Sequence, residues 1–209
     1  MWPLGIRLLR TEILSRIVYS DRLPKLLKDE GIAANVVNAG IGGNHTGSKK
    51  DYKKSYDKHG TERFDSDVCA HQPDIVIIQF GWNDSWIDSP KEGDASRINV
   101  QAYEKNLRHF IETLKKDGAT PLLMTTNQAR ARGLKSWQFD RTEEYVRVVR
   151  TLAKEYKVSL IDVWSIYGSL SEHTGRNMDD LLLDLVHPND AGHQLVAEHL
   201  SEVIKLMGH

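Results

Sequence analysis

Three short segments of the sequence combine polar side chains and glycines in patterns that can support chemistry. In the segment nearest the C-terminus, Asp184 precedes His187 by three positions, and Pro188 stiffens the chain. A carboxylate beside an imidazole fixes the tautomer of the ring and stabilises its protonated form, which is what a general base requires. Most Asp-x-x-His pairs considered alone are surface hydrogen bonds, so both interpretations stay open for this segment.

The second segment, Gly81-Trp82-Asn83-Asp84, follows the most apolar stretch of the chain, at 74–80. That stretch predicts a strand buried on both faces, which places the Asn83 amide at the carboxyl edge of a sheet. An amide N–H in that place can donate a hydrogen bond to a developing oxyanion. The alternative is an Asx turn or a helix cap, the commoner role of an isolated asparagine.

The third segment is the glycine-rich stretch at 38–44, Asn-Ala-Gly-Ile-Gly-Gly-Asn, which follows a short predicted strand. Glycines let the backbone turn sharply and leave N–H groups pointing outward. An ordinary turn between a strand and a helix is the alternative. The glycines stand at 40, 42 and 43 with no acidic partner at the distance that a dinucleotide-binding fingerprint requires, which excludes that class of site.

The elements that must position these segments alternate between short apolar runs and longer amphipathic stretches. Strands separated by helices predict a parallel sheet covered on both faces, with sites at the carboxyl ends of the strands. We therefore expect one domain over residues 1–209 with an α/β fold, a three-layer αβα sandwich. Strands are expected at 35–38, 74–80, 122–125 and 159–163, and helices at 7–30, 63–70, 99–117, 139–156 and 190–207.

Taken together and in this order, the three segments resemble the SGNH (GDSL-type) hydrolase family of esterases and lipases. The resemblance runs from about residue 19 to the C-terminus and is carried by NAGIGGN, GWND and DLVHPNDAGH. It implies a flavodoxin-like sandwich of five parallel strands. It also implies that the Gly43 N–H and the Asn83 side chain form an oxyanion hole, and that His187 is the catalytic base, oriented by Asp184.

The first block of the family, Gly-Asp-Ser at the end of the first strand, is absent from this sequence. No serine precedes Ser15, and Gly93-Asp94-Ala95 carries alanine and follows the Asn83 block. We favour a chain that begins downstream of the first strand and its serine. The other explanation is a natural variant with a displaced nucleophile, at Ser20 or Ser15, or with none. In either case the sheet needs a strand from residues 4–19 or a rearrangement.

The expected function is therefore that of a carboxylic ester hydrolase that works by serine acyl transfer and is impaired as written. The alternative is an inactive pseudo-hydrolase that binds a ligand or a partner. Trp82, Trp86 and Trp137 near the predicted site could stack on sugar rings, which favours O-deacetylation of carbohydrate, although simple packing is the commoner role. Lysophospholipid or thioester substrates come second. The lysine-rich stretch at 49–58 is interleaved with aspartates, which predicts a solvated helix face.

Composition excludes several other classes of function. Lys and Arg total 28 against 29 Asp and Glu, a net charge of −1, which argues against a nucleic-acid partner. The single cysteine, Cys69, excludes an intramolecular disulfide, and the scattered histidines predict no metal site and no cofactor. No apolar run approaches the ~20 residues of a membrane span. The chain as given is expected to be cytoplasmic, unless an upstream segment carries a signal peptide, and its oligomeric state stays open.

Overall fold

A five-stranded parallel sheet forms the centre of the computed structural model, which describes residues 4–9, 17–51, 59–88, 91–129, 135–174 and 177–208. The strand order is β2-β1-β3-β4-β5, and every neighbouring pair runs parallel. This arrangement confirms the α/β sandwich expected from the sequence. The strands are β1 (Leu4–Leu9), β2 (Ala34–Asn38), β3 (Ile75–Gln79), β4 (Thr120–Met124) and β5 (Ser159–Ile161).

The strand β1 corrects two expectations. Residues 7–9 are not helical, and the chain does not lack the central strand: Ile6 pairs with Val36 of β2 on one side and with Ile75 of β3 on the other. The physical reason is that a strand between two others satisfies the backbone groups of both neighbours, and this outweighs a local helical periodicity. The expected helix begins only at Tyr19, and residues 10–16, with the candidate Ser15, lie outside the described residues.

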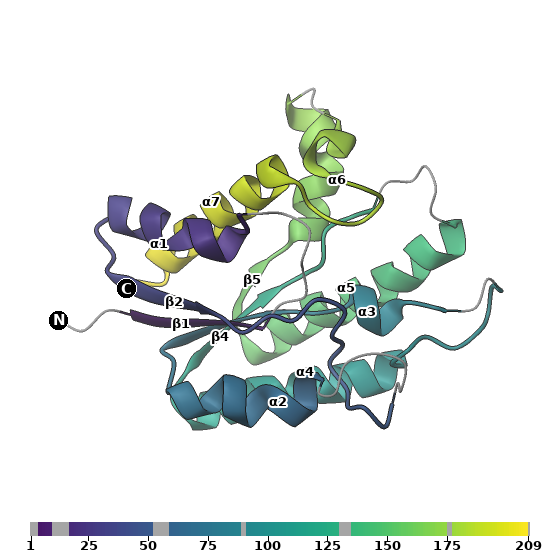
Figure 1. Ribbon diagram of the computed structural model, residues 1–209, viewed down its shortest axis with the longest axis horizontal. Helices are drawn as coiled ribbons and strands as arrows, with labels where there is room; N and C mark the ends of the chain where they lie inside the picture. Colours follow the sequence, from purple (N-terminus) through teal and green to yellow (C-terminus); the bar gives the residue numbers. More distant parts are fainter. Residues whose placement is uncertain are drawn as a thin grey trace.

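Helices cover both faces of the sheet (Figure 1). Alternate side chains of β3 point to opposite faces. Ile75 and Ile77 therefore join the core under α1, α6 and α7, while Val76 and Ile78 join the core under α2, α4 and α5. One layer consists of α1 (Tyr19–Asp29), α6 (Val163–Thr174) and α7 (Asp190–Leu206), and the other of α2 (Gly60–Asp67), α4 (Val100–Lys116) and α5 (Ser136–Tyr156).

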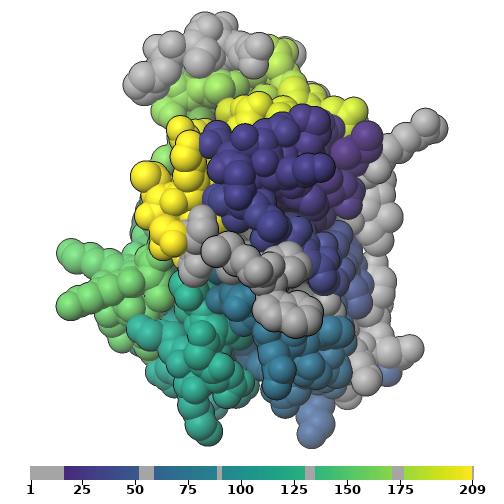
Figure 2. Space-filling view, turned by 90° about the vertical axis from the view of Figure 1, so that its left-hand side faces the viewer, coloured from purple at the N-terminus to yellow at the C-terminus, as the bar shows by residue number. Residues whose placement is uncertain are grey.

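Two of these helices bring the ends of the sequence together. Figure 2 views the molecule from the end at which the strands begin and shows α1, in dark blue, beside α7, in yellow. Arg22 of α1 donates hydrogen bonds to Gln194 and Asp190 of α7 at 3.0 and 3.2 Å. These bonds join the beginning of α7 to α1.

Shorter elements complete the chain, and some boundaries differ from those expected. The helix α6 was not expected, and α5 begins at Ser136, before the expected start at 139, so that Trp137 lies in its first turn. Part of the lysine-rich stretch, 52–58, lies outside the described residues. Among the residues that are described, no helix has the length and apolar character needed to cross a membrane. The short elements are α3 (Trp82–Ser85) and the 3₁₀ helices η1 (Cys69–His71) and η2 (Met178–Leu181).

Candidate active site

The loop at 182–188, called the histidine loop below, forms its own Asp–His pair. Asp184 Oδ2 lies 2.8 Å from His187 Nδ1, and Asp184 Oδ1 accepts the backbone N–H groups of Val186 at 2.9 Å and His187 at 2.8 Å. The loop is closed by a hydrogen bond from Leu183 N to His187 O at 2.8 Å. The Asp-x-x-His spacing therefore gives a complete carboxylate–imidazole unit, and not merely two polar residues on a surface.

The electrostatics of this unit suit a base. Burial by itself raises the pKa of Asp184, but the backbone N–H groups of His187 and Val186 and the imidazole outweigh it and leave that pKa below its ordinary value. The carboxylate therefore stays charged and faces Nδ1, which makes Nδ1 the protonated nitrogen of neutral His187. Nε2 then keeps its lone pair and is the atom that can accept a proton.

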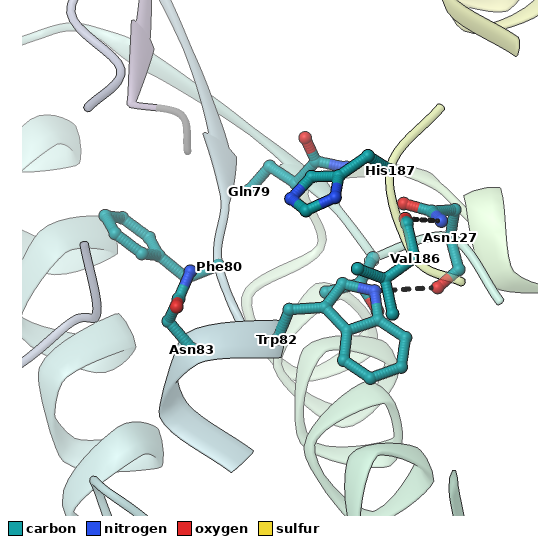
Figure 3. A pocket seen from close by; sticks show the side chains of 8 residues that line it. Gln79, Phe80, Trp82, Asn83, Asn127, Val186 and His187 are labelled. Atoms are coloured by element: carbon teal, nitrogen blue, oxygen red, sulfur yellow. Dashed lines mark hydrogen bonds between the residues drawn. The ribbon is translucent and has the colours of Figure 1, made fainter. Parts of the chain in front are cut away.

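A pocket lies between the ends of β3 and β4 and the histidine loop (Figure 3). His187 and Asn83 both line it, so the structure brings together two of the residues that the sequence predicted. The cavity measures about 50 Å³, which holds a few water molecules at ~10–15 Å³ each. Its described lining consists of Gln79, Phe80, Trp82, Asn83, Thr126, Asn127, Val186 and His187.

Asn127 ties the walls of this pocket together, and nothing in the sequence pattern indicated it. Its side-chain Nδ2 donates to Val186 O, next to His187, at 2.8 Å. Its backbone carbonyl oxygen accepts the Trp82 indole N–H at 3.1 Å (Figure 3). One asparagine thus links the histidine loop to the turn that carries Asn83. The only sequence signal was its position just after the strand β4.

Gln79 is a second lining residue that the motifs did not reveal. The Tyr19 hydroxyl donates to Gln79 Oε1 at 3.3 Å, and Gln79 Nε2 donates to Thr125 O at 3.1 Å. The side chain therefore holds the helix α1 and the end of β4 against the floor of the pocket.

The turn at 81–85, called the asparagine turn below, is held from beneath by a buried carboxylate. Asp84 Oδ1 accepts Thr46 N at 2.8 Å and Thr46 Oγ1 at 2.5 Å, and Asn106 Nδ2 donates to the same hydroxyl at 3.1 Å. Complete burial raises the pKa of Asp84 to about 6, against the effect of the Thr46 hydrogen bonds. Asp84 therefore fastens the asparagine turn to Thr46, two residues after the glycine-rich loop at 38–44.

Gly43 lies in that loop with φ +78°, a left-handed conformation that favours glycine. It is not among the described residues that line the pocket. The loop around it is fixed by Asn44, whose Oδ1 accepts Arg63 Nη1 at 3.1 Å. The structure thus brings Asn83, His187 and Asp184 together. The roles predicted for these three residues and for the Gly43 N–H stay predictions.

Ser20, one of the two candidate nucleophiles, is not among the described residues that line the pocket. It sits in the first turn of α1 and is 4% exposed. No described residue makes a hydrogen bond with its hydroxyl. Of the tryptophans, Trp82 lines the pocket, whereas Trp86 and Trp137 are not among its described lining residues. In the described part of the chain, no group of three or more His, Cys, Asp or Glu side chains could hold a metal ion.

Comparison with known proteins identifies the family of this chain. Residues 15–195 match the model of the GDSL-like lipase/acylhydrolase family. The chain belongs to this family. Its sequence is 30% identical over 169 residues to an acetylxylan esterase from Geobacillus stearothermophilus, a match that covers 79% of this chain and 70% of that protein. It is 28% identical over 178 residues to the uncharacterized lipoprotein YqeF of Bacillus subtilis, covering 74% of this chain and 65% of the lipoprotein.

Solved structures of this family have the same fold. A lipase/acylhydrolase from Enterococcus faecalis superposes with a TM-score of 0.76 at 22% identity, over 97% of this chain and 95% of that one. The acetylxylan esterase Axe2 from Geobacillus stearothermophilus, in a catalytic mutant, superposes with a TM-score of 0.72 at 23% identity, over 94% and 92% of the two chains. This protein therefore has the three-layer sandwich of its family.

Proposed function

We propose that this protein is a carboxylic ester hydrolase that removes small acyl groups, foremost acetyl groups, from carbohydrate. The observation that carries the proposal is the shared pocket of His187 and Asn83, with Asp184 bonded to the far side of the imidazole. Acyl transfer requires a nucleophilic hydroxyl, a base and a donor to the oxyanion, and candidates for the base and the donor line this one cavity.

In the proposed reaction, a hydroxyl group of the protein is the nucleophile, and the fluorophosphonate experiment below is designed to identify it. His187 Nε2 takes the proton of this hydroxyl as its oxygen attacks the ester carbonyl. The oxyanion of the tetrahedral intermediate accepts a hydrogen bond from the Asn83 amide and, by family resemblance, one from the Gly43 N–H. His187 then gives its proton to the leaving alcohol, and the same base activates water to release the acid. Asp184 stabilises the imidazolium in both steps.

The size of the pocket and the relatives support an acetyl substrate. The described part of the pocket, about 50 Å³, has room for a group of the size of an acetyl. The Trp82 indole lines the same pocket and offers an apolar surface to a sugar. The catalytic mutants of the esterase Axe2 replace a serine, an aspartate or a histidine, and its aspartate and histidine are three positions apart, like Asp184 and His187.

The test is hydrolysis of acetylated xylo-oligosaccharides, and of 4-nitrophenyl acetate beside the octanoate ester. Acetate release that is lost in His187→Ala, with the acetate ester preferred, is the expected result. We expect the rate to be low, because the sequence has no Gly-Asp-Ser block. Turnover that persists in His187→Ala overturns the proposal.

A fluorophosphonate probe separates this function from the alternative, a ligand-binding pseudo-hydrolase favoured by the missing block. Labelling of one hydroxyl that depends on His187 supports the hydrolase, and the labelled peptide identifies the nucleophile. Absence of labelling together with absence of turnover overturns the hydrolase in favour of a binding module.

A further inference from the structure

We propose that Arg97, held in place by Asp88, is a positioning residue that fixes the orientation of the Asn83 amide. The inference rests on the proposed function, because it concerns the donor assigned to the oxyanion. Its basis is a contact that no motif predicted: Arg97 Nη1 donates to Asn83 Oδ1 at 2.9 Å.

The chemistry of the guanidinium decides which end of the amide faces the pocket. Arginine carries only donors, so the Asn83 atom beside it must be the carbonyl oxygen. The Asn83 NH₂ group is then directed away from Arg97, and no described residue accepts a hydrogen bond from it. Because Asn83 lines the pocket, this NH₂ group is left for a ligand. If the Asn83 amide were rotated by about 180°, its oxygen would face the pocket and repel an oxyanion.

Asp88 in turn fixes the guanidinium. Arg97 Nε lies 3.0 Å from Asp88 Oδ2, and Arg97 Nη2 lies 2.9 Å from Asp88 Oδ1. Such a two-pronged contact sets the plane of the guanidinium as well as its position. The Arg97 side chain is 17% exposed, so water competes with these bonds only in part.

Backbone hydrogen bonds also join the segment of Arg97 to the asparagine turn and to Trp86, which follows it. Arg97 N donates to Trp86 O at 2.9 Å, and Ile98 N donates to Asp84 O at 3.1 Å. The backbone that carries the Arg97 side chain is therefore itself bonded to Asp84, the neighbour of Asn83. Lysine at this position could donate to Asn83, but it lacks the fork that binds Asp88.

The experiment compares Arg97→Ala, Arg97→Lys and Asp88→Asn in the full chain, with Arg147→Ala as the control. Arg147 is an exposed arginine on α5 that pairs with Glu143 at 2.8 Å. The first readout is ¹⁵N NMR relaxation of the Asn83 side-chain amide, assigned with Asn83→Asp. The second is the hydrolysis of 4-nitrophenyl acetate.

We expect the Asn83 amide to become mobile in Arg97→Ala, less so in Asp88→Asn and Arg97→Lys, and to stay rigid in Arg147→Ala. We expect kcat to fall about tenfold in Arg97→Ala at nearly constant KM, less than the ~10²–10³-fold for loss of a whole donor. A rigid Asn83 amide in both Arg97→Ala and Arg97→Lys overturns the inference.

The two readouts separate the failure of this inference from that of the proposed function. If the parent protein hydrolyses no ester, the proposed function fails, while the relaxation data still decide whether Arg97 orients Asn83. If hydrolysis depends on His187 but Arg97→Ala changes neither kcat nor the amide, only the inference about Arg97 fails.

Discussion

The histidine loop and the asparagine turn face one pocket but are built in different ways. In the histidine loop, Asp184 receives its hydrogen bonds from residues two and three positions further along the chain. In the asparagine turn, Asp84 bonds to Thr46, which is 38 residues away, and Asn83 is oriented from Arg97. The first unit carries its own geometry, whereas the second depends on segments brought by the fold.

The two units also differ in burial. The side chains of Asp184 and His187 are 44% and 38% exposed, so water screens their interaction. Asp84 and Thr46 are fully buried, and their hydrogen bonds form in a medium of low dielectric constant. Changes in the histidine loop should therefore affect catalysis with little effect on stability, and changes beneath the asparagine turn should affect stability first.

The largest expected effect is the loss of the base. His187→Ala should lower kcat by about 10³-fold, within the range usual for general-base catalysis. Asp184→Asn should lower kcat by less, because the base remains. Since both side chains are partly exposed, the free energy of unfolding should change by less than about 0.5 kcal/mol in His187→Ala. In Asp184→Asn it should fall by about 1 kcal/mol or less, because that carboxylate accepts two backbone N–H groups and faces the imidazole. Ester hydrolysis and urea denaturation measure the two quantities, and unfolding of His187→Ala at much lower urea would contradict the contrast.

Lowering the pH should destabilise the buried region beside the asparagine turn more than the histidine loop. His45 directly follows the glycine-rich stretch, and its ring stacks on that of His59 at a centroid distance of 3.7 Å. Burial lowers the pKa of His45 to about 4 and also lowers the pKa of His59. Between pH 6.5 and 4 the unfolded chain binds protons that the folded chain does not. The free energy of unfolding should therefore decrease as the pH is lowered from 6.5 to 4. The contribution of His45 to this decrease should be up to about 3 kcal/mol.

Asp84 acts in the opposite direction over part of this range. Its pKa is raised to about 6, so between pH 6 and 4 the folded state binds the proton first and gains stability. Urea denaturation of the parent, His45→Asn and His71→Asn between pH 7 and 4.5 measures the balance; His71 is exposed and serves as the control. A flatter pH dependence is expected only in His45→Asn, and equal slopes in all three proteins would refute the assignment.

A buried hydroxyl offers a sharper test of the same unit. Thr46→Val keeps the shape of the side chain but removes the donor at 2.5 Å from Asp84 and the acceptor of Asn106. A lost hydrogen bond to a buried charged group should lower the free energy of unfolding by about 1.5–3 kcal/mol. The control is Thr151→Val on the exposed face of α5, which should change it by less than about 0.5 kcal/mol. Equal values for the two variants would show that the buried bonds do not support the turn.

The smallest effect is expected where the two units meet. Trp82→Phe keeps a ring in the pocket but removes the N–H that donates to Asn127 O at 3.1 Å. The loss should be about 1 kcal/mol or less, because water can reach this half-buried site. Differential scanning calorimetry measures the stability, and the His187 imidazole signals in NMR report whether the histidine loop shifts. Unchanged imidazole signals would show that Asn127 holds that loop without Trp82.

Much of the sheet could be predicted because most of its strands are marked by a short run of apolar residues in the local sequence. The apolar stretch at 74–80 became β3, and its unbroken run of large apolar residues fits a strand covered on both faces. The strand β1 was missed, since residues 4–9 overlap a helix-like pattern and their partners lie at Val36 and Ile75, far along the chain. Pairing on both sides decided the conformation of this segment.

The sequence alone determined the fold class and the residues of the histidine loop, since both depend on short-range patterns: the spacing of apolar side chains and an Asp-x-x-His segment before a helix capped by Asn189. Only the tertiary structure decided what surrounds Asn83. Arg97, Asn127 and Thr46 reach the site from separate segments. Hydrogen bonds between such segments follow no fixed spacing, because they form where the packing of helices on the sheet brings donors and acceptors within 3 Å or so of one another.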